Sequence, residues 1–135
     1  PNIYRMLTDY FRGRRIAVVA GECAEWKVST MGCPQGSVLG PTLWNVLLDD
    51  LLALPQGGEG TEMVAYADDV TVLVRGDSRA QLERRAHAVL GLAEGWASRN
   101  QLDFAPAKSR CIMLKGKFQR PPIVRCGSHV IRFET

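Results

Sequence analysis

The chain has 135 residues, a formal net charge of +3 and 46% hydrophobic residues. This length supports one hydrophobic core, and the composition excludes a disordered or collagen-like chain. Its apolar stretches all fall short of the roughly 20 residues that cross a bilayer, so we expect a soluble protein. The mild positive charge permits nucleic-acid binding but does not require it.

The chain begins at Pro1, without a methionine or a signal segment, so we interpret it as an excerpt from a longer polypeptide. Its four cysteines form no Cys-x-x-Cys pair, which argues against a zinc site. Reduced thiols in a nuclear or cytoplasmic protein are expected, and secretion is not. These cysteines are Cys23, Cys33, Cys111 and Cys126.

The first part of the chain predicts a helix followed by a hairpin. Residues 2–11 repeat apolar side chains at helical spacing. Residues 16–20 and 26–30 are rich in β-branched side chains and flank the turn signal Gly21-Glu22. They therefore predict two paired strands.

A glycine-rich loop and an apolar helix come next. Residues 32–40 contain several glycines and a proline, and Pro41 suits a first helical turn, where an N–H would lack a partner. Pro55 and the pair Gly57-Gly58 predict the end of this helix. Its apolar stripe is predicted to consist of Leu39, Leu43, Val46, Leu47, Leu51 and Leu54.

The next segment predicts a tight hairpin and a long amphipathic helix. Residues 63–66 and 70–74 have strand character, and the link 67–69 is short enough for a hairpin turn. Residues 79–99 form the clearest helix of the chain, with Ser78 as its N-cap. The stripe on this helix comprises Leu82, Ala86, Val89, Leu90, Ala93 and Trp96.

Three more strands are predicted at residues 109–114, 123–125 and 130–133, the last two joined through Gly127-Ser128. Hairpins that alternate with two long amphipathic helices indicate an α+β fold. We expect an antiparallel sheet with helices packed on one face.

Two adjacent aspartates, Asp68 and Asp69, fall at the predicted tip of the second hairpin. Aspartate is common in turns, and this alone explains many such pairs, but here the flanking strands are unusually apolar. A hard divalent cation relieves the repulsion between the two carboxylates. The pair therefore predicts a site for Mg²⁺, with Mn²⁺ as the alternative. The other pair, Asp49-Asp50, lies on a predicted helix, where successive side chains point about 100° apart, and it predicts surface charges.

Three segments resemble the reverse transcriptases of non-LTR retrotransposons. Residues 66–69, Tyr-Ala-Asp-Asp, resemble their Tyr-x-Asp-Asp motif. Residues 32–41 followed by 43–45 resemble the conserved segment that precedes this motif, and residues 105–109 resemble the lysine-bearing motif that follows it. The order and the intervals of the three segments also agree.

The resemblance implies RNA-directed DNA polymerisation by two-metal-ion nucleotidyl transfer, with an RNA template, a DNA primer and deoxynucleoside triphosphates as partners. Such chemistry needs carboxylates that hold two metal ions about 3.5 to 4 Å apart. Asp68 is implied as a direct metal ligand and Asp69 as a second, more weakly engaged one. Both count as catalytic residues on this interpretation.

Five further roles are implied by position in the motifs. Gln35 and Gly36 would lie beside the templating base and the incoming nucleotide, and Tyr66 and Ala67 near the primer terminus. Lys108 would protonate the departing pyrophosphate or neutralise its charge. These residues also have purely structural alternatives. Gln35 and Gly36 could form a plain turn that leads into a helix. Tyr66 could be part of the strand core, and Lys108 could be a solvated lysine.

One carboxylate of the family's set is missing here. In the family, a further aspartate comes from a strand that precedes the first helix of this chain, and Asp9, in a predicted helix, does not replace it. Residues 1–135 are therefore predicted to be a single partial reverse transcriptase domain. Its palm-like sheet would be incomplete at the N-terminal side, and the rest of a polyprotein would complete it. The fragment alone is predicted to be inactive and poorly soluble.

Three alternatives remain open at this stage. The chain could be a non-catalytic nucleic-acid-binding remnant of a polymerase palm. It could also belong to a group II intron, telomerase or viral RNA-dependent enzyme, although Ala67 and the Gly-Cys-Pro-Gln-Gly-Ser run favour non-LTR elements. The third alternative is an unrelated α+β interaction module. Trp44 and Trp96 are expected to be packing residues in every case.

Overall fold

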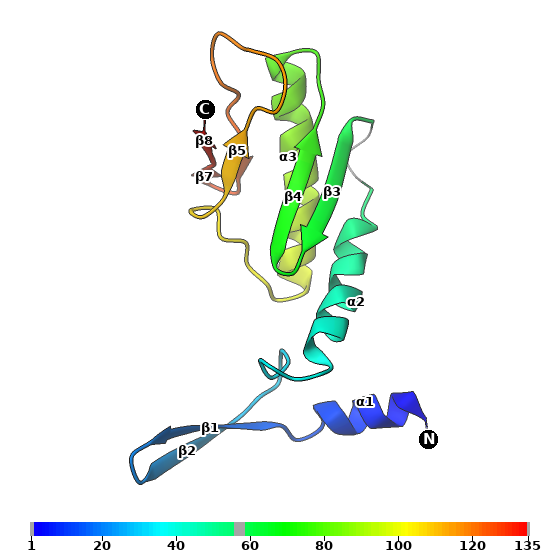
Figure 1. Cartoon of the computed structure of the whole chain (residues 1–135), viewed down its shortest axis with the longest axis vertical. Coiled ribbons are helices and arrows are strands. Elements are labelled where there is room, and N and C mark those ends of the chain that lie inside the picture. Colours follow the sequence, from blue (N-terminus) through cyan, green and yellow to red (C-terminus); the bar gives the residue numbers. More distant parts are fainter. Residues whose placement is uncertain (1, 56–58, 135) are drawn as a thin grey trace. The chain divides into compact units, whose positions relative to one another are not determined.

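The computed structural model describes residues 2–55 and 59–134, which form three helices and eight strands (Figure 1). The chain divides into two compact units, Pro1–Gly40 and Pro41–Thr135.

The first unit contains helix α1 (Ile3–Phe11) and the antiparallel hairpin of β1 (Arg15–Ala20) and β2 (Cys23–Val28). The Asn2 side chain caps the helix by accepting a hydrogen bond from the Tyr4 N–H at 3.2 Å. The predicted helix and hairpin are confirmed. The second strand begins earlier than expected because Cys23 pairs directly with Ala20, which leaves a two-residue turn.

Helix α2 (Gly40–Leu52) buries a narrower stripe than the sequence predicted. Leu48 and Leu51 are buried, and Trp44 and Leu47 pack against the same core. These positions follow the i, i+3, i+4, i+7 spacing of one helix face. Val46 was predicted to share that stripe, but it is 67% exposed. At about 100° per residue it lies on the side of α2 away from Leu48 and Leu51. The helix ends before Pro55, and the predicted terminator Gly57-Gly58 lies outside the described residues.

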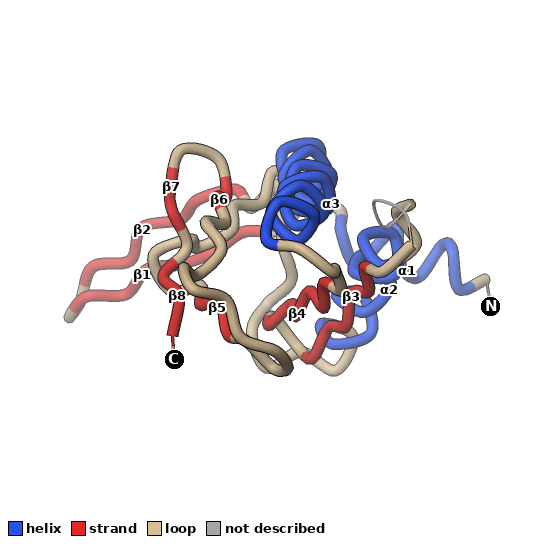
Figure 2. Tube along the Cα trace, turned by 90° about the horizontal axis from the view of Figure 1, so that it is seen from above, coloured by secondary structure: helices blue, strands red, loops and turns tan. Residues whose placement is uncertain are grey.

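The core of the second unit forms where α3 (Arg79–Arg99) covers one face of the hairpin of β3 (Thr61–Tyr66) and β4 (Asp69–Val74) (Figures 1 and 2). The N-cap Ser78 accepts a hydrogen bond from the Gln81 N–H at 3.2 Å, as predicted. Four residues of the predicted stripe, Ala86, Val89, Ala93 and Trp96, are buried, whereas Leu82 and Leu90 are only half-buried. Ala97 is buried as well, which was not predicted. The buried cluster comprises Leu48, Leu51, Met63, Val89, Ala93, Trp96 and Ala97.

The C-terminal segment adds two short strand pairs. Strand β5 (Arg110–Ile112) pairs in parallel with β8 (Arg132–Glu134), and β6 (Arg125–Cys126) pairs antiparallel with β7 (His129–Val130). The predicted strand 130–133 divides at Ile131, whose N–H donates a 2.9 Å hydrogen bond to the Val124 carbonyl. A parallel pair was not expected from the sequence.

Two side chains of α3 attach this segment to the helix. Glu83 accepts a hydrogen bond from the Ile123 N–H at 2.7 Å, and His87 Nε2 accepts one from the Arg125 N–H at 3.1 Å. The backbone hydrogen bond from Ile123, together with Arg79, lowers the pKa of Glu83. The strand β6 therefore depends on polar side chains of α3 as well as on apolar packing.

The α+β class is confirmed, and the elements are those of an incomplete palm-like fragment. Each sheet within the described residues contains two strands, and three of the four pairs are antiparallel. Within the same residues, no helix combines the length and the apolar run that a membrane span requires.

Candidate active site

The β3–β4 hairpin reverses direction in two residues, Ala67 and Asp68. Tyr66 pairs with Asp69, so Asp69 is the first residue of β4. Of the two aspartates, only Asp68 therefore lies in the loop. Ala67 adopts a φ of 52°, which a side chain-bearing residue seldom does. Two-residue hairpin loops usually place glycine, asparagine or aspartate at such a position. An alanine there costs on the order of 1 to 3 kcal/mol.

The strand register decides which side chains share a face of this hairpin. Directly paired residues project to the same side, and sides alternate along each strand. Met63 is buried towards α3, so its neighbours two residues away face the same way. Tyr66 and Asp69 consequently belong to the opposite, open face, and Tyr66 is 85% exposed. The three pairs on the open face are Glu62 with Leu73, Val64 with Thr71, and Tyr66 with Asp69.

The carboxylates of Asp68 and Asp69 are exposed and uncommitted. Among the described residues, neither carboxylate takes part in a recorded hydrogen bond or ion pair. These two hard oxygen donors fit Mg²⁺, which often binds through one or two carboxylates while substrate phosphates and water complete its shell. No group of three or more His, Cys, Asp or Glu side chains in the described part of the chain could hold a metal ion.

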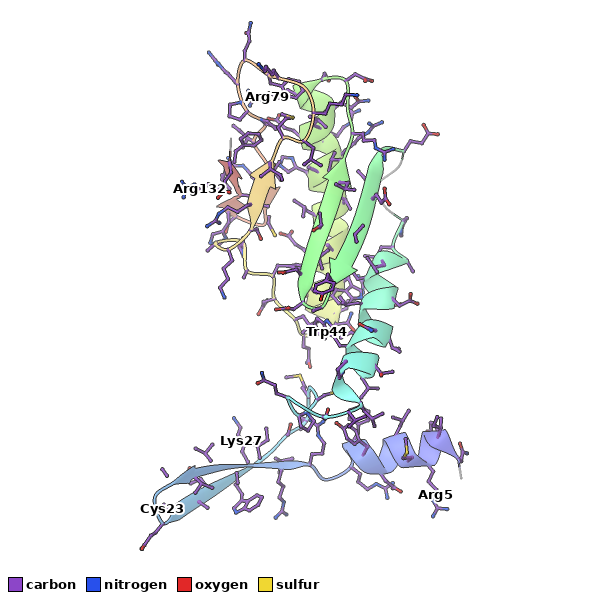
Figure 3. The ribbon with its side chains drawn as sticks, viewed as in Figure 1. Arg5, Cys23, Lys27, Trp44, Arg79 and Arg132 are labelled. Atoms are coloured by element: carbon purple, nitrogen blue, oxygen red, sulfur yellow. The ribbon has the colours of Figure 1, made fainter. Side chains whose placement is uncertain are left out.

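Trp44 of α2 contacts the turn directly. Its indole Nε1–H donates a 2.8 Å hydrogen bond to the Ala67 carbonyl, and Figure 3 shows the side chain at the turn end of the hairpin. The ring also packs against the core cluster. The predicted packing role is confirmed, but sequence reasoning missed the polar contact. The residue type was the available signal, because tryptophan carries a ring N–H donor that phenylalanine and tyrosine lack.

Gln35 and Gly36 occupy the centre of a β-turn in the first unit. The Ser37 N–H donates to the Pro34 carbonyl at 3.1 Å, and Gly36 has a φ of 80°. This is the pattern of a type II turn, whose third position favours glycine. A Cβ on Gly36 would meet nothing within 4 Å, so backbone conformation rather than space requires the glycine. Gln35 is exposed at the turn.

Ser37 connects that turn to neighbouring elements of the first unit. Its Oγ accepts a 3.0 Å hydrogen bond from the Gly40 N–H, at the start of α2, and a 3.3 Å bond from the Tyr10 hydroxyl of α1. A side-chain oxygen that accepts a helix-start N–H is a capping interaction. The loop is thus held at its C-terminal side.

Lys108 lies in a helical turn that precedes β5. Its N–H donates to the Ala105 carbonyl at 2.9 Å, and the Ser109 N–H donates to the same carbonyl at 3.2 Å. The side chain is exposed, and its ammonium makes no recorded ion pair within residues 2–55 and 59–134. The backbone therefore fixes the position of Lys108 and leaves its charge available.

The structure brings four of the predicted site residues together in one turn: Tyr66, Ala67, Asp68 and Asp69. Lys108 lies in a separate loop of the same unit, without a recorded contact to them. Gln35 and Gly36 belong to the other unit. As predicted, the control pair Asp49-Asp50 is exposed on a helix.

A hollow of about 460 Å³ opens near the C-terminal end of α3, but it does not include these residues. Its lining includes Glu94, Leu102, Phe104 and Cys126, and none of the predicted site residues. Burial and the neighbouring Glu94 raise the pKa of Cys126 to about 11. The thiol is therefore protonated at neutral pH, which argues against a nucleophile there.

The family described as reverse transcriptase (RNA-dependent DNA polymerase) matches residues 2–130. The chain therefore belongs to the reverse transcriptase family. This match covers both units and all seven predicted site residues.

The relatives narrow the class to retrotransposons of the non-LTR type. The chain is 33% identical, over 99% of its length, to a Retrovirus-related Pol polyprotein from type-1 retrotransposable element R1 of Bradysia coprophila. It is 36% identical, over 87% of its length, to a putative 115 kDa protein in type-1 retrotransposable element R1DM of Drosophila melanogaster. It is 31% identical, over 72% of its length, to the RNA-directed DNA polymerase from mobile element jockey of Drosophila funebris. The predicted resemblance is confirmed.

The chain spans only a small part of these relatives. It covers 13% of the Bradysia polyprotein and 11% of each of the two Drosophila proteins. No solved structure shows a significant match to it.

Proposed function

We propose that this chain is the palm segment of a non-LTR retrotransposon reverse transcriptase and supplies two of its metal-binding carboxylates. The observation that carries the proposal is the Tyr-Ala-Asp-Asp turn, which presents Asp68 and Asp69 uncommitted at the open end of a packed hairpin. Membership of the reverse transcriptase family supports it. So do the names of the relatives, one of which is an RNA-directed DNA polymerase.

The reaction we propose is two-metal-ion nucleotidyl transfer. The primer 3′ hydroxyl loses its proton to solvent, and its oxygen forms a bond to the α-phosphorus of a deoxynucleoside triphosphate while the bond from that phosphorus to the pyrophosphate oxygen breaks. When bound, Mg²⁺ supplies activation of the primer hydroxyl and neutralisation of charge on the pyrophosphate. Asp68 and Asp69 would hold the cations, with Asp68 as the direct ligand and Asp69 as the more weakly engaged one. Mn²⁺ is the alternative cation.

The other site residues bind and orient the substrates. Tyr66 and Ala67 lie beside the primer terminus, which the open face of the hairpin leaves accessible. The exposed Gln35-Gly36 turn lies beside the templating base and the incoming nucleotide. Lys108 donates a proton to the pyrophosphate or balances its charge. The RNA template, the DNA primer and the rest of the polyprotein are the partners in an intracellular, nuclear or cytoplasmic setting.

The segment by itself is proposed to be inactive because a third carboxylate comes from a strand outside it. Its domain organisation, a single partial reverse transcriptase domain over residues 1–135, is part of the same proposal. The large apolar side chains exposed in the first unit support it, since Ile16, Val18 and Trp26 are each more than half exposed. Such surfaces are normally covered by further protein.

The test is RNA-templated primer extension by the polyprotein that contains this segment. Asp68→Asn removes the charge but keeps the shape, and Asp49→Asn makes the same change on the exposed surface of α2. We expect Asp68→Asn to reduce kcat by more than the roughly 10- to 100-fold that outer-shell partners of a metal cost. Asp49→Asn should extend primers like the unmodified protein.

Two outcomes count against the proposal. Equal extension by both variants would remove Asp68 from the chemistry. An unmodified polyprotein that binds template and primer but extends nothing would instead identify a non-catalytic remnant of a polymerase palm.

A further inference from the structure

We infer that Trp44 is a positioning residue for the acidic turn, because its indole N–H holds the peptide unit that carries Asp68. The inference rests on the proposed role of Asp68 as a metal ligand. It adds a residue of α2 to the acidic turn of the hairpin.

The peptide unit between Ala67 and Asp68 is rigid. The Ala67 carbonyl and the Asp68 N–H belong to one planar group, so fixing the oxygen fixes the direction in which the chain enters Asp68. The ladder cannot do this, because its last pair is Tyr66 with Asp69 and the carbonyl lies beyond it. The 2.8 Å bond from Trp44 is the one hydrogen bond recorded for this carbonyl among the described residues.

The turn is strained at Ala67. Ala67 holds a φ of 52° without the freedom of glycine, and a strained loop has competing conformations of similar energy. The two carboxylates that follow make no recorded contact that would select one of them. The hydrogen bond from Trp44 therefore stabilises the conformation that presents Asp68.

Trp44 itself is held in place by packing against the core. Leu47, Leu48 and Leu51 attach its face of α2 to the core, and the indole packs against the same cluster. A freely moving donor could not fix the position of the Ala67 carbonyl. The indole N–H of Trp44 can do so, because contacts with the core hold the ring independently of the turn.

Trp96 provides a matched control within the same unit. It is 2% exposed, and its Nε1–H has no hydrogen-bond partner in the described structure. Trp96→Phe therefore removes a ring N–H and core volume without removing a contact to the turn. Trp44→Phe removes the N–H that the turn uses. Comparing the two separates positioning from general stability.

The experiment uses the whole polyprotein and has two readouts. The first is amide hydrogen exchange of the peptide covering residues 66–69, measured without metal or nucleic acid. The second is steady-state primer extension. For Trp44→Phe we expect faster exchange at the turn but not in α3. We also expect kcat to fall about tenfold, the factor for one lost hydrogen bond, with an unchanged KM for the nucleotide.

For Trp96→Phe we expect a lower melting temperature with unchanged turn exchange and kcat. Should Trp44→Phe fail to fold, 3-benzothienylalanine at position 44 removes the N–H while keeping both rings. Unchanged exchange at residues 66–69 after loss of the N–H would overturn the inference. Equal effects of Trp44→Phe and Trp96→Phe on the turn would also overturn it. The exchange result stands whether or not Asp68→Asn keeps its activity, so the two proposals fail separately.

Discussion

The hairpins β1–β2 and β3–β4 make the same reversal in different ways. Both pair six residues on each side and both turn in two residues. In the first, Gly21 adopts a φ of 62°, which glycine does without penalty. In the second, Ala67 adopts 52° at a cost, and a tryptophan side chain from another element holds its carbonyl.

The two hairpins also differ in what they bury. In the first, every residue but the half-buried Ala17 is exposed. In the second, one face packs under α3 and Met63 is 6% exposed. A strained turn therefore persists where a packed face and a side-chain contact hold it. The acidic pair is located in that turn.

The largest expected effect tests the difference in burial. Met63→Ala should destabilise the second unit by about 2 to 5 kcal/mol, since it removes buried methylene groups and leaves a cavity. The matched change Val18→Ala, at a side chain that is 67% exposed, should alter stability by no more than about 0.5 kcal/mol. Urea denaturation followed by circular dichroism measures both. Similar losses from the two variants would contradict the assigned burial.

A smaller effect of opposite sign tests the two turns. Gly21→Ala should destabilise the first hairpin by about 1 kcal/mol or more, because alanine resists a positive φ. Ala67→Gly should cost nothing or stabilise the second hairpin by up to about 1 kcal/mol, since it relieves the strain. Denaturation midpoints report both changes. If Ala67→Gly also destabilised the protein clearly, Ala67 would not be strained.

The smallest effect concerns the hydrogen bond between Glu83 of α3 and the C-terminal segment. The pKa of Glu83 in α3 is lowered by the Ile123 N–H and by Arg79, so the folded state favours the ionised form. This contribution to stability is present above the ordinary value of 4.5 and is lost as the pH falls through the lower, folded pKa.

Glu83→Gln should therefore flatten the acid side of the stability curve of the second unit. It should also speed amide exchange around Ile123 at neutral pH, because the carboxylate accepts that N–H. Denaturation at a series of pH values and hydrogen exchange measure the two effects. The exchange of β1–β2 serves as the internal control. An acid limb as steep in the variant as in the unmodified chain would show that other carboxylates cause it.

Much of the local structure could be predicted from the sequence. The ends of α3 and its Ser78 cap follow from capping chemistry and from apolar spacing, both of which act within a few residues. Both hairpins follow from short links between strand-like segments, although each turn proved shorter than the predicted link. The acidic turn was predicted with its residues, although Asp69 proved to be the first residue of β4.

Two of the predictions that failed depended on distant residues. Val46 is as apolar as its neighbours, and only the direction in which α2 packs leaves it exposed. The parallel pairing of β5 with β8 joins segments about 20 residues apart, which no local pattern encodes.

The helices, the hairpins and the family can be predicted without a structure, because each depends on neighbouring residues or on motifs whose order is visible in the chain. The contact of Trp44 with the Ala67 carbonyl and the shared open face of Tyr66 and Asp69 become visible only in the folded chain. A hydrogen bond across 23 residues depends on how α2 packs beside the hairpin. Packing is the sum of many weak contacts, and no single one of them is visible in the order of the residues.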